Sequence, residues 1–203
     1  MIVLLAAGKS TRVGGANKLL VEAAGEPVHE WHKRAASGRA TVAVVNAKHA
    51  QQVREEAPWL SSIIEHDAHD GPGGALLAFD RAKPHGEIIV LFADTLLQRV
   101  PDVHGDWVGV APAPGRVWDY YDKVEGWTRG VPAVLVCCGV YRFTNRPLLR
   151  EVLEELVAEA NEVHIADVLR VYSERQRLSE LVIDGWQDAG DTEALRRVHR
   201  LES

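Results

Sequence analysis

Short apolar runs alternate along the chain with longer segments in which apolar residues recur every three or four positions. The runs are rich in β-branched residues, which favour strands, and the periodic segments are typical of helices with one buried face. We expect strands at residues 2–6, 41–46, 63–65, 88–92, 107–111, 133–143 and 181–183. We expect helices at residues 28–36, 50–56, 74–82, 146–159, 165–172 and 192–201.

The alternation of strand and helix over residues 1–92 is the order that produces a mostly parallel sheet. Helices cover both faces of such a sheet, because each crossover returns over one face. The pattern predicts an α/β fold, with one Rossmann-like domain over residues 1–203 and a mixed, mostly parallel sheet flanked by helices. Ligands of these sheets bind beyond the carboxyl ends of the strands, so the loops after Ala6, Glu65 and Phe92 are the places to look.

The loop after the first strand concentrates small and basic residues. It reads Ala6-Ala7-Gly8-Lys9-Ser10-Thr11-Arg12 and continues to Lys18. Glycine lets backbone N–H groups approach an anion, arginine can bind phosphate through two hydrogen bonds, and lysine supplies a point charge. This combination at a strand end predicts a phosphate-binding loop. A P-loop fits poorly, because the first glycine of that motif would fall at Val3, inside the strand.

The same loop resembles the signature of the sugar-nucleotide pyrophosphorylases and related nucleotidylyltransferases. Their pattern is L-A-A-G-x-G-T-R and then P-K-x-L, against Leu5-Ala6-Ala7-Gly8-Lys9-Ser10-Thr11-Arg12 and then Asn17-Lys18-Leu19-Leu20 in this chain. Ser10 replaces the second glycine, and Asn17 replaces the proline. The short spacer before Lys18 is closer to the phosphocholine cytidylyltransferase-like and capsule-related members. The resemblance implies a glycosyltransferase-A-like, nucleotide-diphospho-sugar transferase fold.

The resemblance also implies roles for the residues of the opening loop. Arg12 and Lys18 would be the catalytic cations. The remaining residues of the loop would bind the nucleotide, and they are Leu5, Ala6, Ala7, Gly8, Lys9, Ser10 and Thr11.

A second glycine-rich stretch follows the third expected strand. Residues 66–76 resemble the family's G-[TL]-A-x-A-L element, whose glycine backbone faces the nucleobase. By that resemblance Gly71 and Gly74 would lie against the base, with His66 nearby. Taken alone, the same stretch also allows a tight turn before a helix. It further allows a metal site of His66 and His69 with Asp67 or Asp70.

Two aspartates are candidate ligands for Mg²⁺. Asp94 follows the apolar strand at residues 88–92, where an unpaired charge is costly and a neighbouring cation removes the cost. The family's G-D-x-L element implies that Asp94 binds the catalytic metal, although an aspartate here could also cap a turn. Residues 186–195 resemble the family's W-x-D-x-G-[TD]-x-E-x-L segment, which implies that Asp188 is the second ligand. We therefore expect both carboxylates to surround one ion.

Two weaker resemblances concern the acceptor. The family carries a substrate-binding lysine in an E-K-P element, which this chain lacks, and Lys123 is the candidate in its place. A solvated lysine explains Lys123 equally. Residues 136–143 resemble the family's N-A-G-I-Y-x-F strand, in which Gly139 would let the sugar approach.

Composition narrows the class of protein. The 23 basic and 29 acidic residues give a net charge of −6, so a broad nucleic-acid-binding face is not expected. No apolar run approaches a membrane span, and residues 1–7 lack the basic flank of a signal peptide. The adjacent Cys137 and Cys138 cannot build a disulfide framework, which favours a reducing compartment and a cytoplasmic protein.

These features together predict a Mg²⁺-dependent nucleotidyltransferase. Its expected partners are a nucleoside triphosphate and a small phosphorylated acceptor, a sugar 1-phosphate, with pyrophosphate as the leaving group. Cytidylyl transfer to phosphocholine, guanylyl transfer to a cofactor and an inactive nucleotide-binding regulator are alternatives with the same fold. A glycosyltransferase would need an Asp-x-Asp motif, and Asp94-Thr95-Leu96 lacks the second aspartate. The nucleobase, the acceptor and the oligomeric state, a homo-oligomer included, stay open.

Overall fold

The computed structural model describes residues 1–8, 14–67, 70–112 and 135–198. Within them, seven strands form one sheet in the order β10-β8-β9-β6-β1-β4-β5. These strands are β1 (Ile2–Ala6), β4 (Thr41–Val45), β5 (Ser62–Glu65), β6 (Ile88–Phe92), β8 (Trp107–Pro112), β9 (Leu135–Phe143) and β10 (Ser179–Val182).

Helices and short strands complete the described part of the chain. The α-helices are α1 (Val28–Ala36), α2 (Ala47–Glu56), α3 (Gly71–Ala82), α5 (Arg146–Glu159), α6 (Ile165–Arg175) and α7 (Thr192–Arg197). A 3-10 turn, η2, spans Lys18–Leu20, and two-residue strands are β2 (Glu22–Ala23), β3 (Glu26–Pro27), β7 (Thr95–Leu96) and β11 (Gln187–Asp188). None of the helices described here is long and apolar enough to cross a bilayer.

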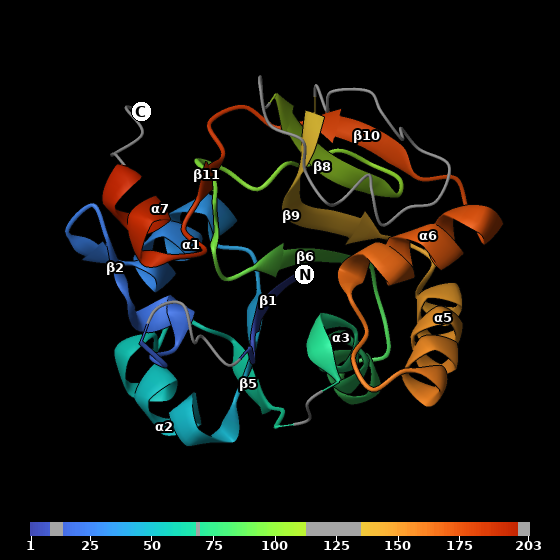
Figure 1. Cartoon of the computed structure of the whole chain (residues 1–203), viewed down its shortest axis with the longest axis horizontal. Helices are drawn as coiled ribbons and strands as arrows, with labels where there is room; N and C mark the ends of the chain where they lie inside the picture. The colour runs from blue at the N-terminus through green and yellow to red at the C-terminus, as the bar shows by residue number, and fades with distance from the viewer. Residues whose placement is uncertain (9–13, 68–69, 113–134, 199–203) are drawn as a thin grey trace.

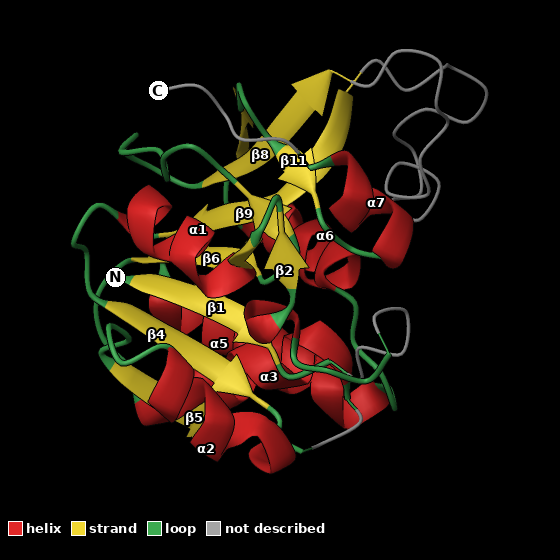
Figure 2. Ribbon diagram, turned by 90° about the vertical axis from the view of Figure 1, so that its left-hand side faces the viewer, coloured by secondary structure: helices red, strands yellow, loops and turns green. Residues whose placement is uncertain are grey.

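The alternation of side chains along each strand divides the core into two layers. In β1, Val3 and Leu5 belong to the layer that contains α3, α5 and α6, whereas Ile2, Leu4 and Ala6 belong to the layer with α1 and α2. The sheet therefore lies between two helical layers (Figure 1), with α1 and α2 in front in Figure 2. Burial on both faces explains why this strand is apolar at every position.

The strand directions confirm the expected mixed, mostly parallel sheet. β1 is parallel to β4 and β6, β4 is parallel to β5, and β10 is parallel to β8. β9 runs antiparallel to β6 and to β8. The register of β8 with β9 shifts between Val108 and Val110, near Gly139, whose φ is +72°. A β-carbon at Gly139 would clash with the Thr95 hydroxyl, so glycine allows the close approach of β9 to β7.

Several expected boundaries are wrong, and capping accounts for part of the difference. Helices α2 and α3 begin three residues earlier than expected, at Ala47 and at Gly71. The Asn46 side chain accepts a hydrogen bond from Lys48 N and starts α2, which also ends β4 at Val45. Helix α6 continues past its expected end at residue 172 to Arg175. The last helix, α7, ends at Arg197, before its expected end at residue 201. Residues 199–203 lie outside the described chain.

The C-terminal segment crosses back over the α1 side of the molecule. β11 pairs antiparallel with β7, which directly follows Asp94. Ala189 packs with Leu96 and Trp31 in a small third core, and the Trp31 indole N–H donates to the Ala23 carbonyl at 3.2 Å. This third core holds the end of the chain beside the end of β6.

A buried ion pair network joins α3 to α5. Asp80 is fully buried and accepts hydrogen bonds from Arg146 Nε at 2.8 Å and from Arg150 Nε at 2.5 Å. The Arg146 guanidinium also lies over the Phe79 ring, 5.2 Å from its centroid. On α6, the Tyr172 ring is fully buried and lies edge-on to the Phe143 ring, with the ring centroids 5.1 Å apart. The helical layer is therefore fixed by charge as well as by apolar packing.

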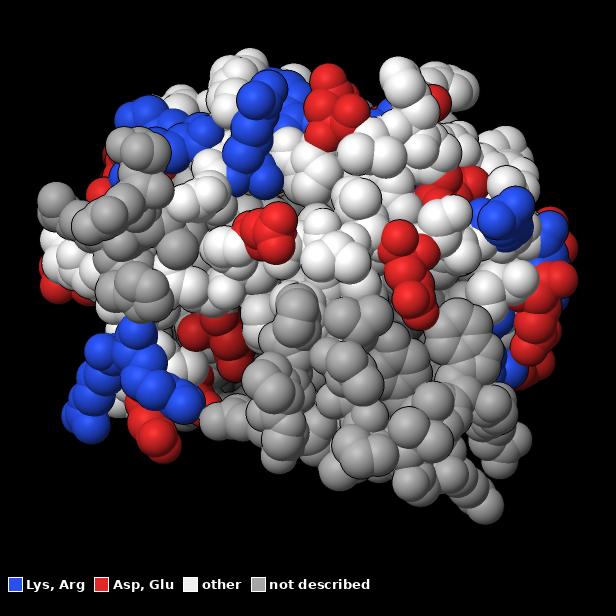
Figure 3. All heavy atoms as spheres, turned by 90° about the horizontal axis from the view of Figure 1, so that it is seen from above, with Lys and Arg blue, Asp and Glu red and all other residues white. Residues whose placement is uncertain are grey.

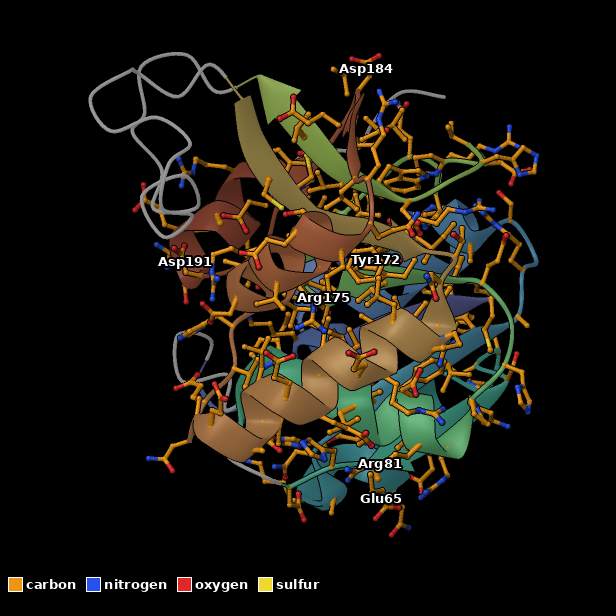
Figure 4. All side chains as sticks on the ribbon, turned by 90° about the vertical axis from the view of Figure 1, so that its right-hand side faces the viewer. Glu65, Arg81, Tyr172, Arg175, Asp184 and Asp191 are labelled. Atoms are coloured by element: carbon orange, nitrogen blue, oxygen red, sulfur yellow. The ribbon has the colours of Figure 1, made fainter. Side chains whose placement is uncertain are left out.

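Replacing Asp80 with alanine is expected to lower the free energy of unfolding by about 3–5 kcal/mol, because the buried Arg146 would lose its partner. Urea denaturation measures the change. The control is Arg81→Ala, which removes the exposed neighbouring side chain labelled in Figure 4 and should cost less than about 0.5 kcal/mol. Equal small losses in the two variants would contradict a stabilising role for the network.

Candidate active site

Lys18 is placed by a buried asparagine. Asn17 donates from Nδ2 to the Ala6 carbonyl at 3.0 Å, and its Oδ1 accepts from Leu19 N at 3.0 Å. The loop is thereby fastened to the carboxyl end of β1. Asn17 has φ −66°, the value that proline would impose, so it keeps the backbone of the family's proline while adding a hydrogen bond to the strand.

Asp94 lies at the same edge of the sheet. Its strand, β6, is parallel to β1 and pairs with it up to Leu5 and Phe92, so the two strands end side by side. Lys18 Nζ forms an ion pair with Asp94 Oδ2, and the side chains of both residues are about one-fifth exposed, at 21% and 22%. The structure therefore brings together a cation and a carboxylate that are distant in sequence.

Asp188 reaches this edge from the C-terminal segment. It pairs with Thr95 in the β11–β7 ladder, and Ala189 N donates to the Asp94 carbonyl at 2.8 Å. A β-carbon built on Gly190 would lie 2.9 Å from Asp188 Oδ1 and 3.5 Å from Asp94 Oδ2. Both carboxylates thus border one small space that a side chain at Gly190 would fill.

The environment of Asp188 works against its ionisation. Desolvation of the carboxyl raises the pKa of Asp188, and the neighbouring Asp94 and Asp191 raise it further. The hydrogen bond from Gly190 N and the charge of Lys18 act in the opposite direction. Asp188 is still exposed as a residue, so water screens part of this repulsion. Two carboxylates beside one lysine leave the group with an excess of negative charge that a further cation would balance.

This arrangement fits a hard divalent cation. Carboxylate oxygens are the ligands that Mg²⁺ prefers, and Mg²⁺ usually takes only one or two of them and keeps water and substrate phosphates as its other ligands. The described residues contain no group of three or more His, Cys, Asp or Glu side chains able to hold a metal. The alternative site of His66 and His69 stays a prediction, because His69 lies outside the described residues.

The stretch after β5 is held by its own contacts. His66 Nε2 lies 2.8 Å from Asp70 Oδ1, and the Asp70 carboxyl packs over Gly74 so closely that a β-carbon would clash with it. Gly71 has φ +73°, and a β-carbon there would lie 2.8 Å from the Val163 carbonyl oxygen. These glycines are explained by the turn and by close protein neighbours. Contact of His66, Gly71 and Gly74 with a nucleobase stays a prediction.

The remaining predicted residues fall into two groups. Leu5, Ala6, Ala7 and Gly8 lie at the end of β1, and Gly139 lies against Thr95 and Phe92. Residues outside the described chain are Lys9, Ser10, Thr11, Arg12 and Lys123. Sequence reasoning missed two residues that shape the site, Asn17 and Gly190. The glycine of the W-x-D-x-G pattern already pointed to Gly190, and the replaced proline was the signal for Asn17.

Comparison with protein families supplies the classification. Residues 2–108 match the MobA-like NTP transferase domain. The chain belongs to this family. The NTP transferase match contains Lys18 and Asp94, and it confirms the class of enzyme that the opening loop resembles, a nucleotidyltransferase. Comparison with curated protein sequences gave no match.

Solved structures of other proteins share the fold of this NTP transferase over nearly the whole chain. A Bacillus anthracis protein assigned as a glucose-1-phosphate thymidylyltransferase, crystallised with sucrose, has a TM-score of 0.76 at 16% identity, covering 100% of this chain and 97% of its own. UTP-bound UGPase from Acinetobacter baumannii has a TM-score of 0.71 at 13% identity, covering 97% and 90%. Inositol-1-phosphate CTP transferase from T. maritima has a TM-score of 0.69 at 12% identity, covering 97% and 95%. The expected nucleotide-diphospho-sugar transferase fold is thereby confirmed.

Replacing Asp188 with asparagine is expected to lower turnover by about 10²–10³-fold. The same change should make the folded protein slightly more stable at neutral pH. The folded-state pKa of Asp188 is raised, so its contribution to stability is largest below the unfolded-state pKa and is lost as the pH rises through the folded-state value. Asparagine removes the ionised carboxylate and its repulsion with Asp94. Thermal melts at pH 7 and at pH 4 measure the effect, which should shrink at the lower pH.

The matched control for this variant is Asp184→Asn. Asp184 is exposed in the loop after β10 and projects outward in Figure 4. Its replacement should leave both turnover and the melting temperature near the wild-type values. A fall in the melting temperature of the Asp188→Asn protein at pH 7 would contradict the electrostatic interpretation of Asp188.

Proposed function

We propose that this nucleotidyltransferase condenses a nucleoside triphosphate with a sugar 1-phosphate to give a nucleoside diphosphate sugar and pyrophosphate. The observation that carries the proposal is the meeting of Lys18, Asp94 and Asp188 at one edge of the sheet. The phosphate-binding character of the loop after β1 adds the expected place for the triphosphate. Similarity of fold to sugar-phosphate nucleotidyltransferases favours a sugar 1-phosphate as the acceptor.

The chemistry needs charge stabilisation more than proton transfer. The acceptor phosphate is already an anionic nucleophile, so it can attack the α-phosphorus in line while the bond to the β-phosphate breaks and pyrophosphate leaves. Lys18 would neutralise part of the negative charge that develops on the phosphate oxygens. Asp94 and Asp188 would hold Mg²⁺, which when bound supplies further neutralisation of phosphate charge. Arg12 is proposed to assist as the second cation of the opening loop.

The charge distribution on the described part of one face differs from that of a nucleic-acid-binding face. On the described part of the face in Figure 3, Lys and Arg side chains lie in small groups between Asp and Glu side chains. A nucleic-acid-binding face would instead gather its basic residues along one continuous stripe. The described part of this face has no such stripe, and the net charge of −6 is also unfavourable for a broad nucleic-acid-binding face.

Pyrophosphate release across a matrix of substrates tests the proposed reaction. The assay combines the four common ribonucleoside triphosphates and dTTP with sugar 1-phosphates, inositol 1-phosphate and phosphocholine, with Mg²⁺ or with EDTA. We expect release only in the presence of Mg²⁺ and with a sugar 1-phosphate. Release with phosphocholine or inositol 1-phosphate but with no sugar 1-phosphate would support nucleotidyl transfer and would contradict the proposed acceptor. Nucleotide binding without release in any combination would instead indicate an inactive regulator.

Lys18→Ala is expected to lower turnover by about 10²–10³-fold, because it removes a cation that stabilises charge in the transition state. Its effect on the melting temperature should be small, since the ion pair with Asp94 is partly exposed. Steady-state pyrophosphate release and thermal melts give the two values. Lys48→Ala, which removes an exposed lysine of α2, is the control and should have wild-type turnover. Near-normal turnover of the Lys18→Ala protein would refute its catalytic role.

A further inference from the structure

A buried histidine of α1 contacts the backbone that leads into Asp94. His32 is 2% exposed, and its Nε2 lies 3.0 Å from the carbonyl oxygen of Ala93. Ala93 is the residue between the end of β6 and Asp94. The contact therefore connects the helical layer to the peptide that carries the carboxylate.

The partners of His32 determine its protonation state. A carbonyl oxygen only accepts hydrogen bonds, so Nε2 must carry the proton. Burial is the main cause that lowers the pKa of His32 to about 4, and the ring is therefore neutral at physiological pH. Its Nδ1 has no hydrogen-bond partner in the described part of the structure, which suits an unprotonated nitrogen because an orphaned acceptor costs less than an orphaned donor. His32 is a neutral donor held in one tautomer.

The hydrogen bond from His32 completes a set of three around Asp94. Ala93 N donates to the Leu5 carbonyl at 3.1 Å, which continues the pairing of β6 with β1. Ala189 N donates to the Asp94 carbonyl at 2.8 Å from the C-terminal segment. The backbone itself makes these two bonds. The bond from His32 is made by a side chain, so it can be removed without changing any strand.

We propose that His32 is a positioning residue for divalent-cation binding, because its hydrogen bond to the Ala93 carbonyl fixes the peptide from which the Asp94 carboxylate projects. This inference rests on the proposed function, in which Asp94 is a ligand of the ion. A histidine that served only to fill the core would contribute to stability and leave the affinity for the ion unchanged.

Two substitutions separate positioning from packing. His32→Gln keeps an N–H donor at about the same distance from the backbone as the histidine Nε2. His32→Leu keeps a comparable side-chain volume and removes the donor. The affinity for Mn²⁺ is measured on the full chain, without turnover, from the decrease of the electron paramagnetic resonance signal of the free ion. The Asp94→Asn variant lacks the proposed carboxylate ligand, so the Mn²⁺ binding that it loses relative to wild type is the binding at the proposed site. We expect His32→Leu to bind Mn²⁺ about fivefold more weakly than wild type, the effect of one net hydrogen bond, and His32→Gln to stay within roughly twofold.

The outcomes distinguish the two proposals. Wild-type and Asp94→Asn proteins with equal Mn²⁺ affinity would overturn the metal site and the role of His32 with it. Site-dependent binding in wild type that is unchanged in folded His32→Leu protein would overturn the role of His32 alone.

A spectroscopic measurement on the wild-type chain tests the inference if His32→Leu fails to fold. The ¹⁵N resonances of the His32 ring, identified by their loss in His32→Gln, should report a neutral ring protonated at Nε2 from pH 5 to 8, as expected for a pKa of about 4. A ring protonated at Nδ1, or a cationic ring within that range, would overturn the proposed hydrogen bond.

Discussion

The carboxyl ends of β1 and β6 lie next to each other, and the ion pair between Lys18 and Asp94 forms across this junction. Parallel pairing makes both strands end at the same edge, so any residue that follows one strand meets residues that follow the other. The pairing register of the two strands fixes where that meeting happens. A shift of β6 by one residue would turn its apolar side chains to the opposite faces and move Asp94 away from Lys18.

The third member of the site depends on a different kind of contact. Asp188 comes from a segment that forms a two-residue ladder with β7, and its position also relies on the small core around Trp31 and Ala189. This core places a second carboxylate close to the first at a cost in desolvation and in electrostatic repulsion, both of which raise the pKa of Asp188. Unfavourable charge that the remaining fold has to offset is typical of binding sites, where a ligand supplies the missing opposite charge.

Buried polar side chains connect the two parts of the site to the rest of the molecule. Asn17 fastens the lysine loop to the Ala6 carbonyl, and His32 contacts the Ala93 carbonyl from α1. Both carbonyls lie at strand ends, where the sheet no longer supplies a hydrogen-bond partner for every backbone group. The side chains that satisfy them therefore serve the fold and the geometry of the site together. Gly190 contributes by having no side chain, which leaves the space beside the two carboxylates open.

The sequence by itself determined the order of the elements, because the apolar periodicity of strands such as β1 and β6 and of helix α5 follows from their burial. It also indicated Lys18, Asp94 and Asp188, since a charge at the end of an apolar strand or inside a family pattern stands out locally. Only the tertiary structure decided that these three meet, and that protein atoms lie so close to Gly71 and Gly74 that a side chain at either position would clash. The hydrogen-bond partners of Asn17 and His32 were likewise decided by the tertiary structure, because each side chain binds a carbonyl group in a distant segment that no local pattern encodes. Local propensity acts over a few residues, whereas the hydrogen bonds and charges that build this site join segments tens of residues apart.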